Sequence, residues 1–248
     1  MEPVLLGYFA KSVTRNLKAP GVEEVCSVSG CVSSPPSGWV DLWRHNDFGV
    51  YDSERLAESV VHDAFQILVE PDPASKPPWK VTLRQEPFPN GQLFAYKMFP
   101  TLFGVEGPED LPVDGSKVEP LSEPFEKLGY DVVERAGGCV LGFGCSPLSC
   151  NGRAFDLAVN RHCLFDDPAE ALRRAEEFGR SHGRVAEPGP YVVIEVWRRR
   201  GPVLDREACA ASAQPIDPNL IRHAVKGPLA NAKSASSSPD QPAVEARG

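Results

Sequence analysis

Two pairs of cysteines have the residue types and the spacing best suited to chemistry. Each pair encloses four residues, and the pairs are Cys26 with Cys31 and Cys145 with Cys150. Two thiolates on a short, turn-rich spacer can face one metal ion, and two to four intervening residues is the usual spacing in zinc sites. Serine occurs between the cysteines of both pairs, which suits a tight turn. Zinc binding is therefore one hypothesis for this chain.

Histidine and a further cysteine could complete such a site. The candidates are His45, His162 and Cys163. One zinc shared by the four paired cysteines and two separate sites are equally conceivable. The separate sites would consist of Cys26, Cys31 and His45, and of Cys145, Cys150 and His162. In a strand the adjacent His162 and Cys163 would point to opposite faces, so at most one of them would bind the metal.

The cysteines have two other interpretations. A catalytic thiol needs a base within hydrogen-bond reach, and His162, oriented by Asn160, could serve Cys145 or Cys150. No local signature of a known thiol-enzyme family accompanies these residues. Cysteine is also among the most buried residue types and fills apolar space. We favour this last interpretation over zinc, because a bare C-x4-C pattern is weaker than the double C-x2-C patterns that identify zinc sites.

Other motifs that bind cofactors are missing from the sequence. The glycine-rich stretch 137–144 has neither the Lys-Ser/Thr of a phosphate-binding loop nor a dinucleotide fingerprint, so we interpret it as a hairpin turn. The acidic pairs Asp166-Asp167 and Glu176-Glu177 fit a helix cap and a solvated helix face. We therefore assign no catalytic residue and no cofactor-binding residue.

Composition and charge argue against several classes of partner. The net charge of −8 disfavours nucleic acid, whose binding depends on Lys and Arg. The one basic run, Arg198-Arg199-Arg200, follows an apolar strand and marks where that strand leaves the core. No stretch approaches the roughly 20 apolar residues of a membrane span, and the N-terminal apolar run is too short for a signal peptide. We expect a cytoplasmic protein without a nucleic-acid or membrane partner.

Strand and helix signals occur in the same order in both halves of the chain. The first half has strand patterns over 4–13, 39–43 and 93–99, a cysteine loop, and a helical period over 52–65. The second half repeats several short motifs of the first in chain order, and the offset between matched motifs falls almost steadily along the chain. Leu128-Gly129-Tyr130 matches Leu6-Gly7-Tyr8, and the second cysteine loop matches the first. Phe155-Asp156-Leu157 matches Val40-Asp41-Leu42, and a helix expected at Asp167 matches one expected at Asp52.

This order predicts an α+β fold made of two diverged copies of one strand–loop–strand–helix–strand unit. The copies would occupy 1–104 and 126–200, separated by a proline-rich linker or long loop over 105–125. Two such units can cover each other's apolar faces, so we expect one compact domain. An extension over 201–226 and a disordered tail over 227–248 would follow, because the tail has no aromatic residue and little apolar periodicity.

The leading functional hypothesis follows from these observations. We expect a non-catalytic module that binds a protein or a small molecule in the groove between its two halves. The alternative is a zinc-binding or thiol-dependent protein, including an enzyme, that uses the two C-x4-C loops.

Overall fold

The computed structural model describes most of the chain up to Gly201. The described residues are 2–15, 17–29, 39–40, 45–63, 65–71, 73–74, 79–85, 91–122, 124–135, 143–181, 183–184 and 186–201. Several sequence predictions lie outside them: Cys31, most of the glycine-rich stretch 137–144, nearly all of the extension 201–226 and the whole tail 227–248.

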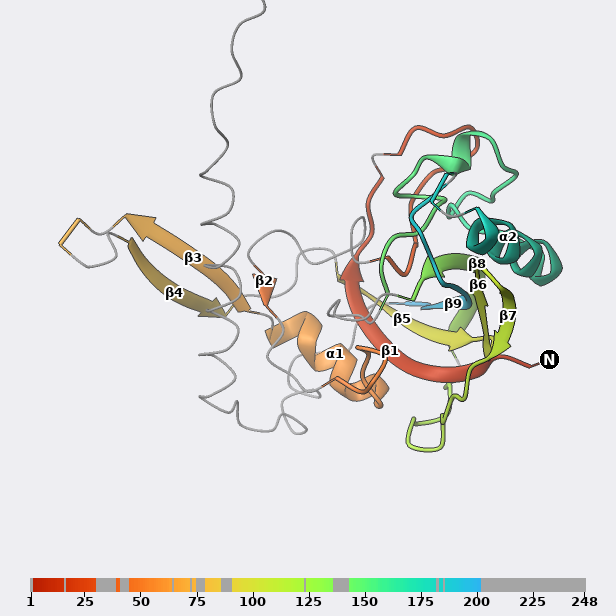
Figure 1. Cartoon of the computed structure of the whole chain (residues 1–248). Coiled ribbons are helices and arrows are strands. Elements are labelled where there is room, and N and C mark those ends of the chain that lie inside the picture. Colours follow the sequence, from red (N-terminus) through yellow and green to blue (C-terminus); the bar gives the residue numbers. More distant parts are fainter. Residues whose placement is uncertain are drawn as a thin grey trace, which may run out of the picture.

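An antiparallel sheet of six strands forms the centre of the described structure. The strands are β1 (Val4–Ser12), β5 (Gly91–Met98), β6 (Thr101–Gly104), β7 (Gly107–Asp110), β8 (Phe125–Glu134) and β9 (Tyr191–Arg199). β9 is flanked by β5 and β8, and β1 lies outside β5. Figure 1 shows that the strands are strongly curved. The first six residues of β9 are buried, so this strand places Trp197, Arg198 and Arg199 where it leaves the core.

Two helices complete this mixed α+β fold. α1 (Glu54–Asp63) packs against β1 and β5, whereas α2 (Pro168–Arg180) packs against β6, β8 and β9. The start of α2 was predicted correctly: the Asp167 side chain accepts a hydrogen bond from the Ala169 amide, and Pro168 occupies the first turn. Ala171, Ala175 and Phe178 form its buried stripe.

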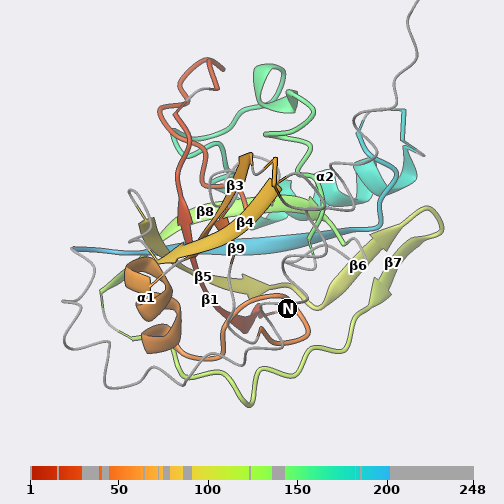
Figure 2. The same cartoon turned by 90° about the vertical axis from the view of Figure 1, so that its left-hand side faces the viewer.

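A smaller sheet of three strands accompanies the main one. It consists of β2 (Trp39–Val40), β3 (Phe65–Pro71) and β4 (Trp79–Gln85) in antiparallel order. Figure 1 shows the β3–β4 hairpin standing away from the curved main sheet, and in Figure 2, which is seen from that side, the hairpin lies in front of the sheet.

The same turn occurs at two places in the chain, each centred on an asparagine. The Asn46 side chain donates to Leu6 O and Asp52 Oδ1 and accepts from the amides of Phe48 and Val50. The Asn160 side chain makes the corresponding bonds with Leu128 O and Asp166 Oδ1, and with the amides of His162 and Leu164. Each turn thereby fixes the approach to one helix, α1 after Asp52 and α2 after Asp166.

A glycine in each outer strand accommodates the neighbouring turn. Gly7 has φ +143° and Gly129 has φ +144°, and each lies at a register shift, in β1 and β8. A Cβ atom would lie 2.3 Å from Tyr51 O at Gly7 and 2.6 Å from Phe165 O at Gly129. Both positions therefore require glycine, because a side chain would be strained and would also collide with backbone.

Three details of the predicted fold are wrong. The stretch 105–125 is more than a linker, because β7 pairs with β6 in a hairpin and β8 begins at Phe125. Residues Arg153–Phe155 form a 3₁₀ helix, so Phe155-Asp156-Leu157 is no strand. The first helix ends at Asp63, and Phe65 belongs to β3. Proline content was misleading at β7 because it is an edge strand, where proline is tolerated.

Candidate functional site

The first cysteine loop is held against the Asn160 turn of the second half. The Val25 amide donates to the carbonyl of Thr14, two residues beyond the end of β1, which brings the loop back to the sheet. The Cys26 amide then donates to His162 O at 3.0 Å. These two backbone bonds place Glu24 and Cys26 beside the His162 side chain, although the residues are far apart in the sequence.

Glu24, Cys26 and His162 form a compact group of potential metal ligands. One ligand atom from each residue lies within 4.8 Å of those from the other two. Among the described residues, this is the group in which three His, Cys, Asp or Glu side chains come close enough to hold one metal ion. Glu24 Oε1 is 2.8 Å from His162 Nδ1. Cys26 is fully buried, whereas about a tenth of the Glu24 and His162 side chains is exposed.

The electrostatics of this group keep Glu24 ionised and Cys26 protonated. Burial alone would raise the pKa of Glu24, but hydrogen bonds and charge interactions with Arg198 and His162 outweigh it and lower the pKa. Burial and the nearby Glu24 carboxylate raise the pKa of Cys26 to about 12. Cys26 is therefore a thiol at neutral pH and a poor nucleophile.

Two arginines surround the group. Arg198 Nη1 donates to Glu24 Oε1 at 2.6 Å, and Arg198 Nη2 donates to Glu126 Oε1 at 3.3 Å. Arg161 Nε donates to His162 Nε2 at 3.3 Å. Because Nε2 accepts this bond, the neutral imidazole carries its proton on Nδ1 and donates it to Glu24.

A polar cavity opens beside these residues. Its volume is about 660 Å³. Its wall combines residues from both halves of the chain: Arg15, Glu23, Glu24, Gly91, Gln92 and Leu93 from the first, and Arg161, Arg198, Arg199 and Gly201 from the second. Four arginines and two glutamates give the wall a formal excess of positive charge, in a chain whose net charge is −8.

A buried polar network lies in the core and joins the two cysteine loops. The Asp131 carboxylate in β8 accepts hydrogen bonds from Ser27 Oγ, the Val28 amide and Ser146 Oγ. Lys11 is also fully buried, and its Nζ donates to Ser27 O. Burial raises the pKa of Asp131 and lowers that of Lys11 to about 8. The network fixes the positions of both loops, and we assign it no chemical role.

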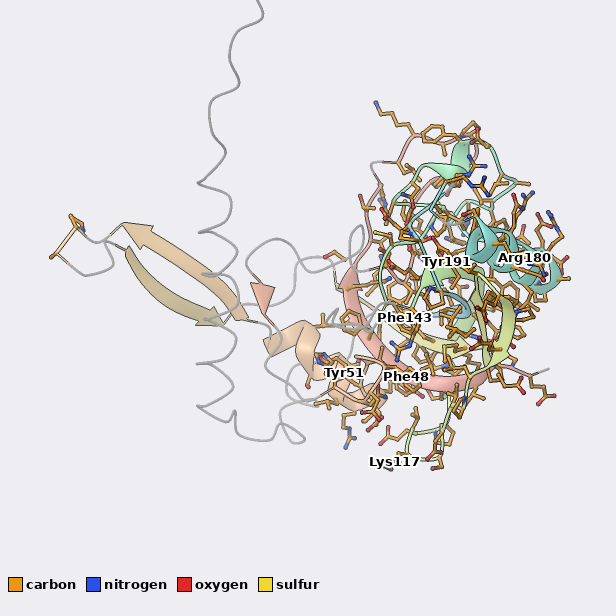
Figure 3. All side chains as sticks on the ribbon, in the orientation of Figure 1. Phe48, Tyr51, Lys117, Phe143, Arg180 and Tyr191 are labelled. Atoms are coloured by element: carbon orange, nitrogen blue, oxygen red, sulfur yellow. The ribbon has the colours of Figure 1, made fainter. Side chains whose placement is uncertain are left out.

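At the Asn46 turn, in contrast to the polar group at the Asn160 turn, aromatic side chains pack around Arg135. The Arg135 guanidinium lies 5.3 Å from the ring centroid of Phe48 and 5.7 Å from that of Phe143. Figure 3 places Phe48, Phe143 and Tyr51 on the α1 side of the body, whereas Tyr191 and Arg180 lie on the α2 side. Phe48 occupies the same position in the Asn46 turn that His162 occupies in the Asn160 turn.

The predicted site residues are distributed among different surroundings. Cys26 and His162 meet, in a combination that neither of the two separate sites anticipated. His45 contacts the ring of Tyr51 at 4.7 Å. The Cys145 carbonyl accepts a bond from the Glu134 amide, and Cys150 Sγ lies 3.2 Å from Ser29 Oγ. Cys163 is buried in a turn with φ +62°, not in a strand, and burial raises its pKa to about 12.

Sequence reasoning missed the acidic and basic residues of the site. Arg198 and Arg199 were interpreted only as the end of a strand, yet both side chains are mostly buried and form ion pairs, Arg198 with Glu24 and Arg199 with Glu54 and Glu58. The signal was present in Glu24, which stands two residues before Cys26. In an extended segment such a spacing puts both side chains on one face.

The fold and the site define a mixed α+β protein with a polar, arginine-lined cavity. Comparison with models of known families, with curated proteins and with solved structures finds no match for the chain. Neither helix in the described part is long and apolar enough to cross a membrane.

Proposed function

We propose that this protein is a non-catalytic module that binds a small molecule carrying a phosphate or carboxylate group. The cavity whose wall combines residues of both halves carries this proposal. A volume of about 660 Å³ falls within the range of about 300 to 1,000 Å³ that is usual for small-molecule sites. The arginines favour an anionic group, because the guanidinium presents planar donors that match phosphate and carboxylate.

Two of the four arginines are best placed to receive the ligand. Arg198 is already paired with Glu24 and Glu126, and Arg199 with Glu54 and Glu58. Arg15 and Arg161 are exposed at the cavity wall. Arg161 lies 3.9 Å from Glu23, but both side chains are more than half exposed and such pairs contribute little. We therefore assign the first contacts with the anion to Arg15 and Arg161.

We also infer that the two halves are diverged copies, as the sequence pattern predicts. The matched asparagine turns, the strained glycines and the placement of one helix after each turn support this inference. Under it, Phe48 and His162 are equivalent positions. One copy then fills its turn region with Phe48, Phe143 and Arg135, while the other keeps a polar region beside a cavity. Divergence of this kind gives a single ligand site for two similar units.

Thermal unfolding of the full chain with anionic probes tests the binding proposal. We expect inorganic phosphate or malonate to raise the melting temperature, because a ligand that binds only the folded state stabilises it. The two probes separate a preference for phosphate from one for carboxylate. Replacing Arg161→Ala should weaken binding of the better probe about tenfold or more, since a hydrogen bond to a charged group contributes about 1.5 to 3 kcal/mol.

Arg173→Ala is the matched control. Arg173 lies on the exposed face of α2 and pairs with Glu170, away from the cavity lining. Its removal should leave probe binding unchanged. Equal losses in the Arg161 and Arg173 variants, or no stabilisation of the wild-type chain by either probe, would contradict the proposal.

The alternative hypothesis stays a prediction in its original form. A zinc- or thiol-dependent protein built on two complete C-x4-C loops would need Cys31, which lies outside the described residues. No catalytic residue is assigned to either hypothesis.

A further inference from the structure

We propose that Glu24, Cys26 and His162 bind one divalent transition-metal ion of the zinc type. This inference is independent of the proposed anion binding, although Glu24 belongs to both the group and the cavity wall. The three residues offer a carboxylate oxygen, a thiolate sulfur and an imidazole nitrogen. Zinc binds all three donor types, and three protein ligands with one open position form its usual catalytic-type coordination.

The distances within the group suit this ion. Tetrahedral zinc has bonds of about 2.0 to 2.3 Å, so its ligand atoms lie between about 3 and 4 Å apart. The three ligand atoms already lie within 4.8 Å of one another, with Glu24 Oε1 and His162 Nδ1 2.8 Å apart. Small side-chain shifts therefore suffice. Sulfur and nitrogen donors also argue against Mg²⁺ and Ca²⁺, which prefer oxygen ligands.

The ligand set offsets the charge of the ion. Glu24 is anionic, and loss of the Cys26 thiol proton adds a second negative charge, so these two ligands match a divalent cation. The neighbouring Glu126 is already paired with two arginines, Arg198 and Arg200. Arg198 can keep its bond to Glu126, whereas its bond to Glu24 Oε1 must lengthen when that oxygen binds the metal.

Binding also requires a change at the histidine. The proton on Nδ1 must leave that nitrogen, and the neutral ring then carries its proton on Nε2. Arg161 can no longer donate to Nε2 in that tautomer, but its side chain is 61% exposed and is free to turn towards solvent. The ring loses no net proton. The single proton released to solvent comes from the thiol of Cys26, because a thiol binds zinc as the thiolate.

Metal titration of the chelator-treated full chain tests the proposal. We expect about one Co²⁺ or Zn²⁺ per chain, a thiolate-to-cobalt charge-transfer band, and release of about one proton per ion bound. Affinity should rise with pH, because the thiol must lose its proton. Replacing Cys26→Ser or His162→Gln should reduce affinity at least about tenfold, since even outer-shell partners of a metal change it by about 10- to 100-fold.

Two matched variants serve as controls. Cys145→Ser and His45→Gln remove the same residue types elsewhere and should leave affinity unchanged. Circular dichroism of each metal-free variant checks its fold. If the Cys26 or His162 variant does not fold, the charge-transfer band and the proton release of the wild-type chain decide the question.

The contradicting results are equally definite. The wild-type chain binding neither ion, binding that lacks the thiolate band, or binding that is lost in the Cys145 or His45 variant would each overturn the proposal. Anion binding is measured on chelator-treated protein with Arg15→Ala. Arg15 lines the cavity and belongs to neither the ligand group nor the residues that hydrogen-bond to it, so Arg15→Ala should weaken the anion probe while leaving metal affinity intact. The failure of one proposal is thereby distinguishable from failure of the other.

Discussion

At the scale of single residues, the core contains charged groups that other proteins rarely bury. Lys11 and Asp131 are both fully buried and are linked through Ser27, which accepts from Lys11 and donates to Asp131. The Lys11 amine also lies 4.9 Å from the ring centroid of Phe94 and 5.4 Å from that of Tyr96. Such a buried network stabilises the fold only while its polar groups keep their hydrogen bonds. Its contribution to the free energy of unfolding therefore depends on the protonation of Lys11 and Asp131.

Lys11 should therefore make stability depend on alkaline pH. Burial lowers its pKa from 10.5 to about 8 in the folded protein, so between about pH 8 and 10 the unfolded chain binds the extra proton. Stability from this group consequently rises as pH increases through that window, by at most about 3 kcal/mol. Urea unfolding of wild-type and Lys11→Met protein across the window should reveal it as a growing difference in favour of the wild type.

The test depends on the difference in stability between the wild-type protein and the Lys11→Met variant. Cys26 and Cys163 have pKa values raised to about 12, so the unfolded chain loses their protons first and both proteins lose stability as pH rises above about 8.5. That loss is common to the pair and largely cancels in the difference. A difference that stays constant from about pH 8 to 10 would show that Lys11 titrates normally in the folded state.

At the scale of elements, the outer strands β1 and β8 depend on their glycines. Gly7 and Gly129 allow the Tyr51 and Phe165 carbonyls to approach the strand backbone. Tyr8 and Tyr51 exchange backbone hydrogen bonds of 2.8 Å, and Tyr130 and Phe165 exchange bonds of 2.9 Å. Each glycine thus connects a strand of the main sheet to the turn that precedes a helix.

Replacing Gly7→Ala should destabilise the fold strongly. The new Cβ would lie 2.3 Å from Tyr51 O and 2.9 Å from Val50 Cγ2, at a φ that side chains rarely adopt. We expect a loss of about 3 kcal/mol or more in the free energy of unfolding. The matched control is Gly21→Ala, where φ is +76° but no atom lies within 4 Å of the new Cβ. There the backbone cost alone, about 1 to 2 kcal/mol, should appear. Equal losses at the two sites in chemical denaturation would contradict the steric argument.

Local patterns were informative where neighbouring residues determine the structure. The cap at Asp167, the strands β1, β5 and β9, and the repeated Leu-Gly-Tyr words were all visible in the sequence. The hairpin β6–β7 was not, because Pro108 lies within β7 and proline indicates a strand only where that strand is at the edge of a sheet, as β7 is. The contacts of Glu24 with His162 and Arg198 could not be predicted from the sequence either. It depends on backbone bonds from the first cysteine loop to the Asn160 turn, and the spacing along the chain encodes no such contact.

At the scale of the whole molecule, β9 connects the two halves. It pairs with β5 of the first half and with β8 of the second, and its last residues line the cavity. Gln92 and Leu93 at the start of β5 line the same cavity. A ligand there would contact both halves at once. The proposed function therefore depends on the packing of the halves and not on either one alone.

The location of a bound anion tests this account most directly. A crystal structure of the full chain soaked with tungstate, a phosphate analogue with a strong anomalous signal, would locate the ion without assumptions. We predict tungsten density in the cavity between the Arg15 and Arg161 guanidinium groups, because these arginines line it and are exposed. Tungstate bound only at other sites, with the cavity containing nothing but water, would contradict the proposal that this cavity binds an anionic ligand.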